Sequence, residues 1–214
     1  RLFKSKDYLS KENKMLKELL DESYLNNFVI SREKSFFYDH SSLNKIINGN
    51  KFIESYSLAK LKSFNPNIFN CCDKHRMYIE IIQNTNKDIK EGAVFNETGI
   101  IGQVVNNKSF YEVMLLTDTK SSIPLTNSKG DFYCNASGSG ASDYITCSYS
   151  QLVWLDNHEL GEKFFSSGLG GIYPKGIEIG NLESIKIVDT STTLLTIKLI
   201  SNPLHSNLFG VIKL

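Results

Sequence analysis

The residues most suggestive of chemistry lie in one glycine-rich stretch, SSGLGGIYPKGIEIG, at 166–180. A dinucleotide-binding turn needs GxGxxG between a strand and a long helix, because the pyrophosphate sits on the helix N-terminus. Gly168 and Gly170 fit that spacing, but Tyr173 stands at the third glycine position. A P-loop fails as well, because Lys175 has no upstream GxxxxG. The stretch therefore predicts neither a cofactor site nor a phosphate site.

Serines beside glycines suggest a second chemistry, that of a serine hydrolase. A catalytic triad needs a serine next to a histidine base that a carboxylate orients. Ser139 in SGSGAS and Ser167 in SSGLGG match neither GDSGG nor GxSxG. His75 has Asp73 two residues away, a pairing that we expect at the surface. We therefore predict no catalytic residues, and a trypsin-like hydrolase using Ser139 or Ser167 is the alternative with the least support. The other histidines are His40, His158 and His205.

Acidic residues make no better case for acid–base catalysis. Glu97 lies in the hairpin-like NETG, and Glu159 and Glu162 lie in a loop ahead of the glycine-rich stretch. We expect all three in solvated turns, whereas acid–base chemistry would need a pocket.

The four cysteines predict no metal site, because they form no CxxC and have no histidine pair at zinc spacing. Cys71 and Cys72 are adjacent and are poor candidates for bridging each other. Cys134 and Cys147 flank the turn-rich NASGSGASDYIT and would face each other if the two arms form a hairpin. Two reduced thiols and a disulfide are both open, and an oxidising compartment favours the disulfide.

A structural reading explains the glycine-rich stretch without a ligand. KFFSS predicts a strand that ends in GLGG, where positive φ or close backbone approach is needed. Pro174 and Gly176 then suit a tight turn, and IEIG alternates as a half-buried strand should. We expect Gly180 to open the next bend or bulge. Of Phe164 and Phe165, alternation predicts that one points into the core and the other outward.

The bulk composition is that of an ordinary globular protein. The chain has 214 residues, 41% hydrophobic and 22% charged, with a formal net charge of +1, which gives no global argument for nucleic-acid binding. No run of apolar residues is long enough to span a membrane. The sequence starts with arginine within an apparent helix, so we expect that a membrane anchor precedes it.

Residues 1–28 predict a helix of coiled-coil type, because they are periodic and contain no glycine or proline. The seam residues, candidates for self-association, are Leu2, Leu9, Asn13, Leu16 and Leu20. The helix could equally pack on its own domain. Residues 29–55 are expected to form a connector with a helical turn at SLNKIIN.

From residue 56 onward, short β-branched and aromatic segments alternate with turn clusters, which predicts many antiparallel strands. We expect a mainly β protein with two small barrels, at 56–126 and 127–214, between which strands could cross. No long amphipathic helix interrupts the pattern, which excludes a doubly wound α/β fold.

Four segments in order resemble the MreC family of bacterial rod shape-determining proteins. They are KENKMLKELL, NTNKDIKEGAVFNETGIIGQVV, LLTDTKSSIPL and LGEKFFSSGLGGIYPKGIEIG. The positions that carry the family pattern are Gly92, Gly99, Gly102, Asp118, Gly168, Gly170, Gly171, Pro174, Gly176 and Gly180. The sequence departs from it at Thr85 and Asn86, at Glu162 where aspartate is common, and at Tyr173 where phenylalanine is usual.

The resemblance implies two trypsin-like barrels without the triad, and a non-enzymatic scaffold of the cell-elongation complex with no cofactor. It implies that the scaffold binds and activates a class B penicillin-binding transpeptidase in peptidoglycan synthesis, and contacts MreD and the MreB-containing complex. It also implies self-association, and a single-pass anchor on the periplasmic side of the inner membrane. Candidate partner contacts are Phe164, Phe165 and Tyr173. A self-assembling structural filament is the main alternative.

Overall fold

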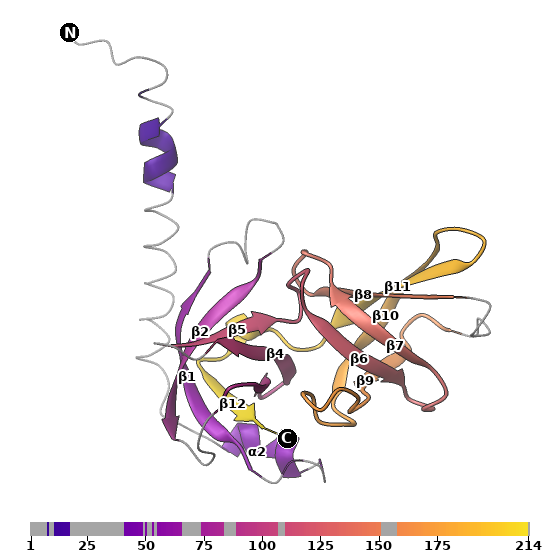
Figure 1. The fold of residues 1–214 in the computed structure, drawn as a ribbon, viewed down its shortest axis with the longest axis horizontal. Helices are drawn as coiled ribbons and strands as arrows, with labels where there is room; N and C mark the ends of the chain where they lie inside the picture. The colour runs from indigo at the N-terminus through magenta and orange to yellow at the C-terminus, as the bar shows by residue number, and fades with distance from the viewer. Residues whose placement is uncertain are drawn as a thin grey trace.

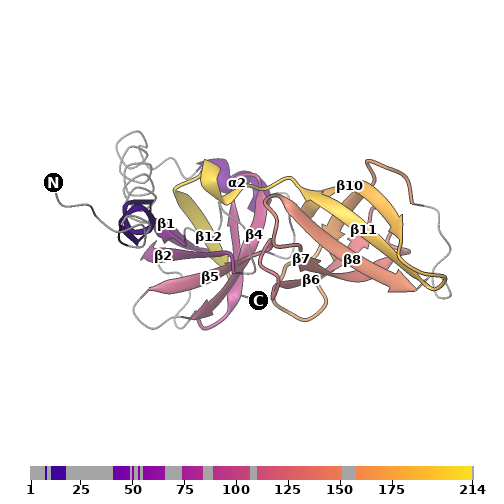
Figure 2. The same ribbon diagram turned by 90° about the horizontal axis from the view of Figure 1, so that it is seen from above.

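The computed structural model describes residues 8, 11–17, 41–48, 50, 53, 55–65, 74–83, 89–106, 110–150 and 158–213. Within these residues the protein is mainly β, and its strands form two closed, six-stranded antiparallel barrels (Figure 1). The predicted fold class is therefore confirmed. Viewed from above, the barrels lie side by side (Figure 2). No helix among the described residues is long and apolar enough to cross a membrane.

The first barrel is closed by pairing in the order β1, β12, β3, β4, β5, β2. Its strands are β1 (Ser57–Phe64), β2 (Arg76–Gln83), β3 (Gly92–Asn96), β4 (Gly99–Asn106), β5 (Tyr111–Leu115) and β12 (Leu208–Ile212). Inward side chains such as Met77, Ile79 and Val113 are fully buried, as alternation requires. Gly210 gives room for the ring of Phe95, since a Cβ there would lie 2.1 Å from ring atoms.

The second barrel follows the order β10, β11, β8, β7, β6, β9. Its strands are β6 (Ser122–Asn127), β7 (Tyr133–Gly138), β8 (Tyr144–Ser150), β9 (Lys163–Ser166), β10 (Glu178–Ile187) and β11 (Thr192–Leu199). A short 3-10 helix, Pro203–His205, lies between β11 and β12. Ile145, Leu195 and Ile197 fill the interior.

The first crossing between the barrels lies a few residues before the predicted boundary near residue 127, and one strand crosses back, which the prediction allowed. β6 belongs to the second barrel, and the chain's last strand, β12, returns to the first barrel between β1 and β3. The physical reason is closure, because β1 and β3 would both leave an unpaired edge without β12.

Little of the N-terminal region falls within the described residues. Residues 8 and 11–17 are helical, with Asn13 and Leu16 exposed, while Leu2, Leu9 and Leu20 lie outside the described part. The expected helical turn in the connector is α2 (Ser41–Asn48), which lies beside β12 (Figure 1). Its Leu43 is buried in the same apolar cluster as Ile212.

Candidate functional site

The chain passes between the barrels at residues 116–121, and this link is fastened by the buried carboxylate of Asp118. Asp118 accepts hydrogen bonds from the backbone N–H of His75 and of Lys120, both at 2.9 Å. The Nε atom of Arg76 lies 3.1 Å from Asp118 Oδ2 in an ion pair that is not aligned as a hydrogen bond. One side chain thus ties the link to β2 of the first barrel.

His75, predicted to lie at the surface, is buried with 1% of its area exposed. Its Nδ1 lies 2.7 Å from Thr117 Oγ1, within the interbarrel link. Burial lowers the pKa of His75, and the nearby Asp118 carboxylate partly opposes that shift. The neighbouring Asp73 could not indicate that His75 contacts Thr117 and Asp118, because these two residues lie 42 and 43 residues further along the chain.

The second barrel holds the same link from the other side. Gly140 N–H donates to Thr117 O at 3.1 Å. Gly138 packs so closely that a Cβ would lie 2.1 Å from Asp118 O. Residues 116–121, here called the joint, therefore have strands of both barrels packed directly on their backbone.

Further contacts join the barrels along their shared wall. Tyr173, which precedes β10, donates from its hydroxyl to Gln103 Oε1 on β4 at 2.9 Å, and its burial raises the pKa of the phenol. Ser201 Oγ donates to Ile100 O at 2.5 Å. Ile100 and Ile179 belong to one apolar cluster that spans both barrels. The two barrels therefore share a core as well as two chain crossings.

The glycine-rich stretch forms a loop that closes on itself at this wall. Ser166 Oγ donates to Pro174 O and accepts from Ile177 N at 3.0 Å. The backbone has positive φ, between 68° and 83°, at Gly168, Gly170, Gly171 and Gly176. Such φ values favour glycine. The loop is thereby folded tightly enough to present the side chain of Leu169, which is 57% exposed.

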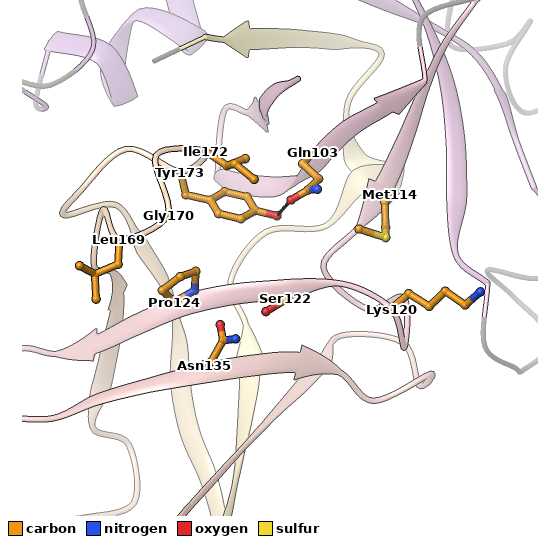
Figure 3. Close-up of a pocket in the computed structure, with 10 residues that line it drawn as sticks. All are labelled: Gln103, Met114, Lys120, Ser122, Pro124, Asn135, Leu169, Gly170, Ile172 and Tyr173. Atoms are coloured by element: carbon orange, nitrogen blue, oxygen red, sulfur yellow. Dashed lines mark hydrogen bonds between the residues drawn. The ribbon is translucent and has the colours of Figure 1, made fainter. Parts of the chain in front are cut away.

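This loop forms one wall of a pocket of about 270 Å³ in the crevice between the barrels (Figure 3). The first barrel contributes neighbouring side chains of β4 and β5, and the second contributes β6 and β7. The lining residues are Gln103, Met114, Lys120, Ser122, Pro124, Asn135, Leu169, Gly170, Ile172 and Tyr173.

A second hollow, of about 380 Å³, is also lined by residues of the loop and shares Ile172 with the first. Its other lining residues are Lys90, Glu91, Gly92, Gly171 and Lys213. The loop, here called the crest, therefore borders both hollows, and lysines line both.

The predicted partner contacts divide according to their burial. Phe164 is fully buried in the second barrel and Phe165 is half-buried, so one points inward and the other more outward. Tyr173 is also buried, against the first barrel. Phe164 therefore fills the core of the second barrel, and Tyr173 fills the interbarrel wall while also lining the pocket; that these residues contact a partner stays a prediction.

Three of the remaining motif glycines allow close packing of backbones. A Cβ at Gly92, Gly102 or Gly180 would lie within 2.4 Å of a carbonyl oxygen on the adjacent strand. At Gly102 that oxygen belongs to Met114, directly behind the crevice. Gly99, whose φ is 155°, is the first residue of β4, directly after the turn that joins it to β3.

A second polar cluster lies in the second barrel, and it corrects the prediction that Glu162 is solvated. His158 Nδ1 lies 2.7 Å from Glu162 Oε2, and Asn127 Nδ2 donates to Glu162 Oε1 at 3.1 Å. The His158 ring packs edge to face with Phe132 at 4.4 Å. Glu159 and Glu97 are exposed, as expected.

The serines considered for catalysis bond to the backbone. Ser139 Oγ donates to Tyr144 O at 2.8 Å, and Ser167 Oγ accepts from Leu169 N at 3.3 Å. His75 and His158 bond elsewhere, to Thr117 and Glu162. Across the described residues, no three histidine, cysteine or acidic side chains are placed to share a metal ion.

The structure joins Cys134 and Cys147 in a disulfide between β7 and β8. Their Cα atoms are 6.2 Å apart, and the register pairs Cys147 with Ala136, so the bridge is diagonal. Cys71 and Cys72 lie outside the described residues.

Known proteins that match this chain in sequence or structure agree with the two-barrel fold. The family model "Rod shape-determining protein MreC, barrel core" matches residues 68–213. The cell shape-determining protein MreC of Haemophilus influenzae is 27% identical over 181 residues, which cover 81% of this chain and 47% of that protein. The chain thus spans about half the length of this relative.

Two solved structures share the fold. MreC from Pseudomonas aeruginosa has a TM-score of 0.63 at 22% identity, covering 74% of this chain and 99% of that one. A chain of the complex between Penicillin-Binding Protein (PBP2) and MreC from Helicobacter pylori has a TM-score of 0.54 at 18% identity, covering 74% and 97%. Because the family model covers most of both barrels, this chain belongs to the MreC family of rod shape-determining proteins.

Proposed function

We propose that this chain is the periplasmic part of a non-enzymatic scaffold that binds a class B penicillin-binding transpeptidase and favours its active arrangement. The observation that carries the proposal is the MreC barrel core, together with a solved PBP2–MreC complex of the same fold. Activation would require the scaffold to bind the active state of the enzyme more tightly than the inactive state. A single upstream helix would anchor it to the inner membrane beside MreD and the MreB-containing complex.

The interbarrel joint supports a scaffold role. The Asp118 contacts and the cluster that contains Ile100 and Ile179 hold the barrels in one arrangement. A rigid arrangement reduces the entropy lost when a partner binds.

We propose that the transpeptidase binds the hairpin formed by the ends of β10 and β11, here called the arm. The arm projects from the end of the second barrel (Figure 1). Ile187 and Val188 are 66% and 55% exposed, and Ile185 is 40% exposed. Clustered exposed apolar side chains are typical of protein interfaces.

The test measures binding of a purified transpeptidase ectodomain by calorimetry, together with its rate. We expect Ile187→Ser to weaken binding about tenfold, as for an interface residue worth about 1.4 kcal/mol, without lowering the melting temperature. Ile82→Ser on β2 is the matched control, since Ile82 is 41% exposed on the first barrel. If Ile187→Ser binds the transpeptidase as tightly as the unmutated chain, the arm is not the binding surface. If the unmutated chain neither binds the transpeptidase nor changes its rate, the proposed scaffold function is wrong.

Self-association through the N-terminal helix is part of the proposal. Leu16 is 54% exposed and Asn13 is exposed on the helical segment, which leaves these two positions of the predicted seam accessible to a second helix. Concentration-dependent sedimentation, with and without the transpeptidase, separates an adaptor from a filament that assembles alone.

A further inference from the structure

The pocket between the barrels combines an apolar interior with polar groups that the fold does not use. Met114, Pro124 and Ile172 supply apolar surface around the side chains of Ser122 and Asn135 (Figure 3). A pocket of this kind suits one apolar side chain of a ligand that also offers hydrogen-bonding groups.

One edge of the pocket is an open strand edge. Asn127 N–H donates to Phe132 O on the β7 side of β6, whereas Pro124 O accepts from Ser167 N on the opposite side. Backbone groups two residues apart along a strand point the same way, so the N–H and C=O of Ser122 face the side of Pro124 O. β9 pairs only with Leu125–Asn127, and so ends before it reaches Ser122.

The lining of the pocket carries a positive charge. Among the described residues, Lys120 is the one charged residue that lines the pocket, and none of the ion pairs between them includes its ammonium. The charge therefore selects for an acidic ligand.

We propose that this crevice binds an extended, acidic polypeptide segment of a partner protein by strand addition at Ser122. The segment's backbone would bond the free edge of β6, an aliphatic side chain would enter between Met114 and Ile172, and a carboxylate would reach Lys120. Strand addition gives affinity through the backbone, and pockets for alternate side chains give specificity. The proposal is independent of the transpeptidase contact assigned to the arm.

The test uses the full chain, ¹⁵N-labelled, and two synthetic peptides with blocked ends, TEVLVET and its charge-reversed counterpart TKVLVKT. We expect the acidic peptide, titrated to about 1 mM, to shift the amide signals of Ser122, Gln103 and Lys120, and the basic peptide to bind more weakly. Equal binding of the two peptides, shifts confined to the arm, or no shift with either peptide would overturn the proposal.

Variants make the test specific. We expect Lys120→Glu to weaken binding of the acidic peptide about fivefold, while Lys186→Glu, at an exposed lysine of β10, leaves it unchanged. Ser122→Pro removes the edge N–H and should abolish binding, on a strand edge that already carries Pro124. Binding that survives both Lys120→Glu and Ser122→Pro would refute the geometry. The transpeptidase measurements would be unaffected by that failure, since they depend on Ile187.

Discussion

Replacing Asp118 by asparagine should destabilise the whole pair of barrels. Asp118 is fully buried, and the side chain of Arg76 is 9% exposed. Asparagine keeps the shape but loses the charge, and it can accept with one oxygen where the carboxylate accepts with two. Among the described residues, Arg76 would then keep one carboxylate partner, Glu112, whose Oε1 lies 3.9 Å from its Nε.

The expected magnitude follows from this geometry. Leaving one member of a buried ion pair without its partner costs about 3–5 kcal/mol. A domain's total unfolding free energy is about 5–15 kcal/mol, so the loss would be a large share of it. For a chain of this size the melting temperature should fall by about 6–20 °C.

Urea unfolding followed by circular dichroism measures the loss. The double variant with Arg76→Met should regain much of it, because it leaves no unpaired charge at the fully buried Asp118 position, and Glu112, which also loses Arg76, has a side chain that is 18% exposed. Asp189→Asn, at an exposed carboxylate that bonds Ser191, is the control and should change little. A loss below about 1 kcal/mol for Asp118→Asn, or purely additive effects in the double variant, would refute the assignment of Asp118 as the fastening of the joint.

Two further predictions concern the same wall. Tyr173→Phe removes the hydroxyl that donates to Gln103 and should lower the unfolding free energy by about 1 kcal/mol. A double-mutant cycle with Gln103→Leu should show coupling, and additive losses would contradict the contact. His75 has a lowered pKa in the folded protein, so the unfolded chain binds its proton more readily. Its stabilising contribution is present above about pH 6.5 and is lost as the pH falls below that value, an effect that Asp118 partly opposes. The urea midpoint should therefore drop less between pH 7.5 and 5.5 in His75→Gln than in the unmutated chain, and an equal drop would rule out His75 as the cause.

The sequence predicted the strands and turns because each depends on residues that are close together in the chain. Alternation indicated that Phe164 and Phe165 face opposite ways, and the spacing of glycines in 166–180 suggested a turn without a ligand. These features depend on neighbours within a few residues, which the sequence displays directly.

Long-range pairing could not be read in the same way. The segment Leu208–Ile212 looks like any other strand, and nothing in it shows that it closes the first barrel rather than the second. The burial of His75 and Arg76 depends on Asp118, more than forty residues away. The burial of Glu162 likewise depends on Asn127, 35 residues earlier.

Three of the four segments that mark the family meet where the barrels meet. GIIGQVV supplies Gly102 and Gln103, LLTDTKSSIPL supplies Asp118 and the pocket edge, and the glycine-rich stretch supplies the crest. The arm lies outside all of these segments. Residues at the joint should therefore affect stability and binding together, whereas residues on the arm should affect binding alone. Comparing Asp118→Asn with Ile187→Ser in one binding assay, at a temperature where both variants are folded, would separate the framework of the scaffold from its contact with a partner.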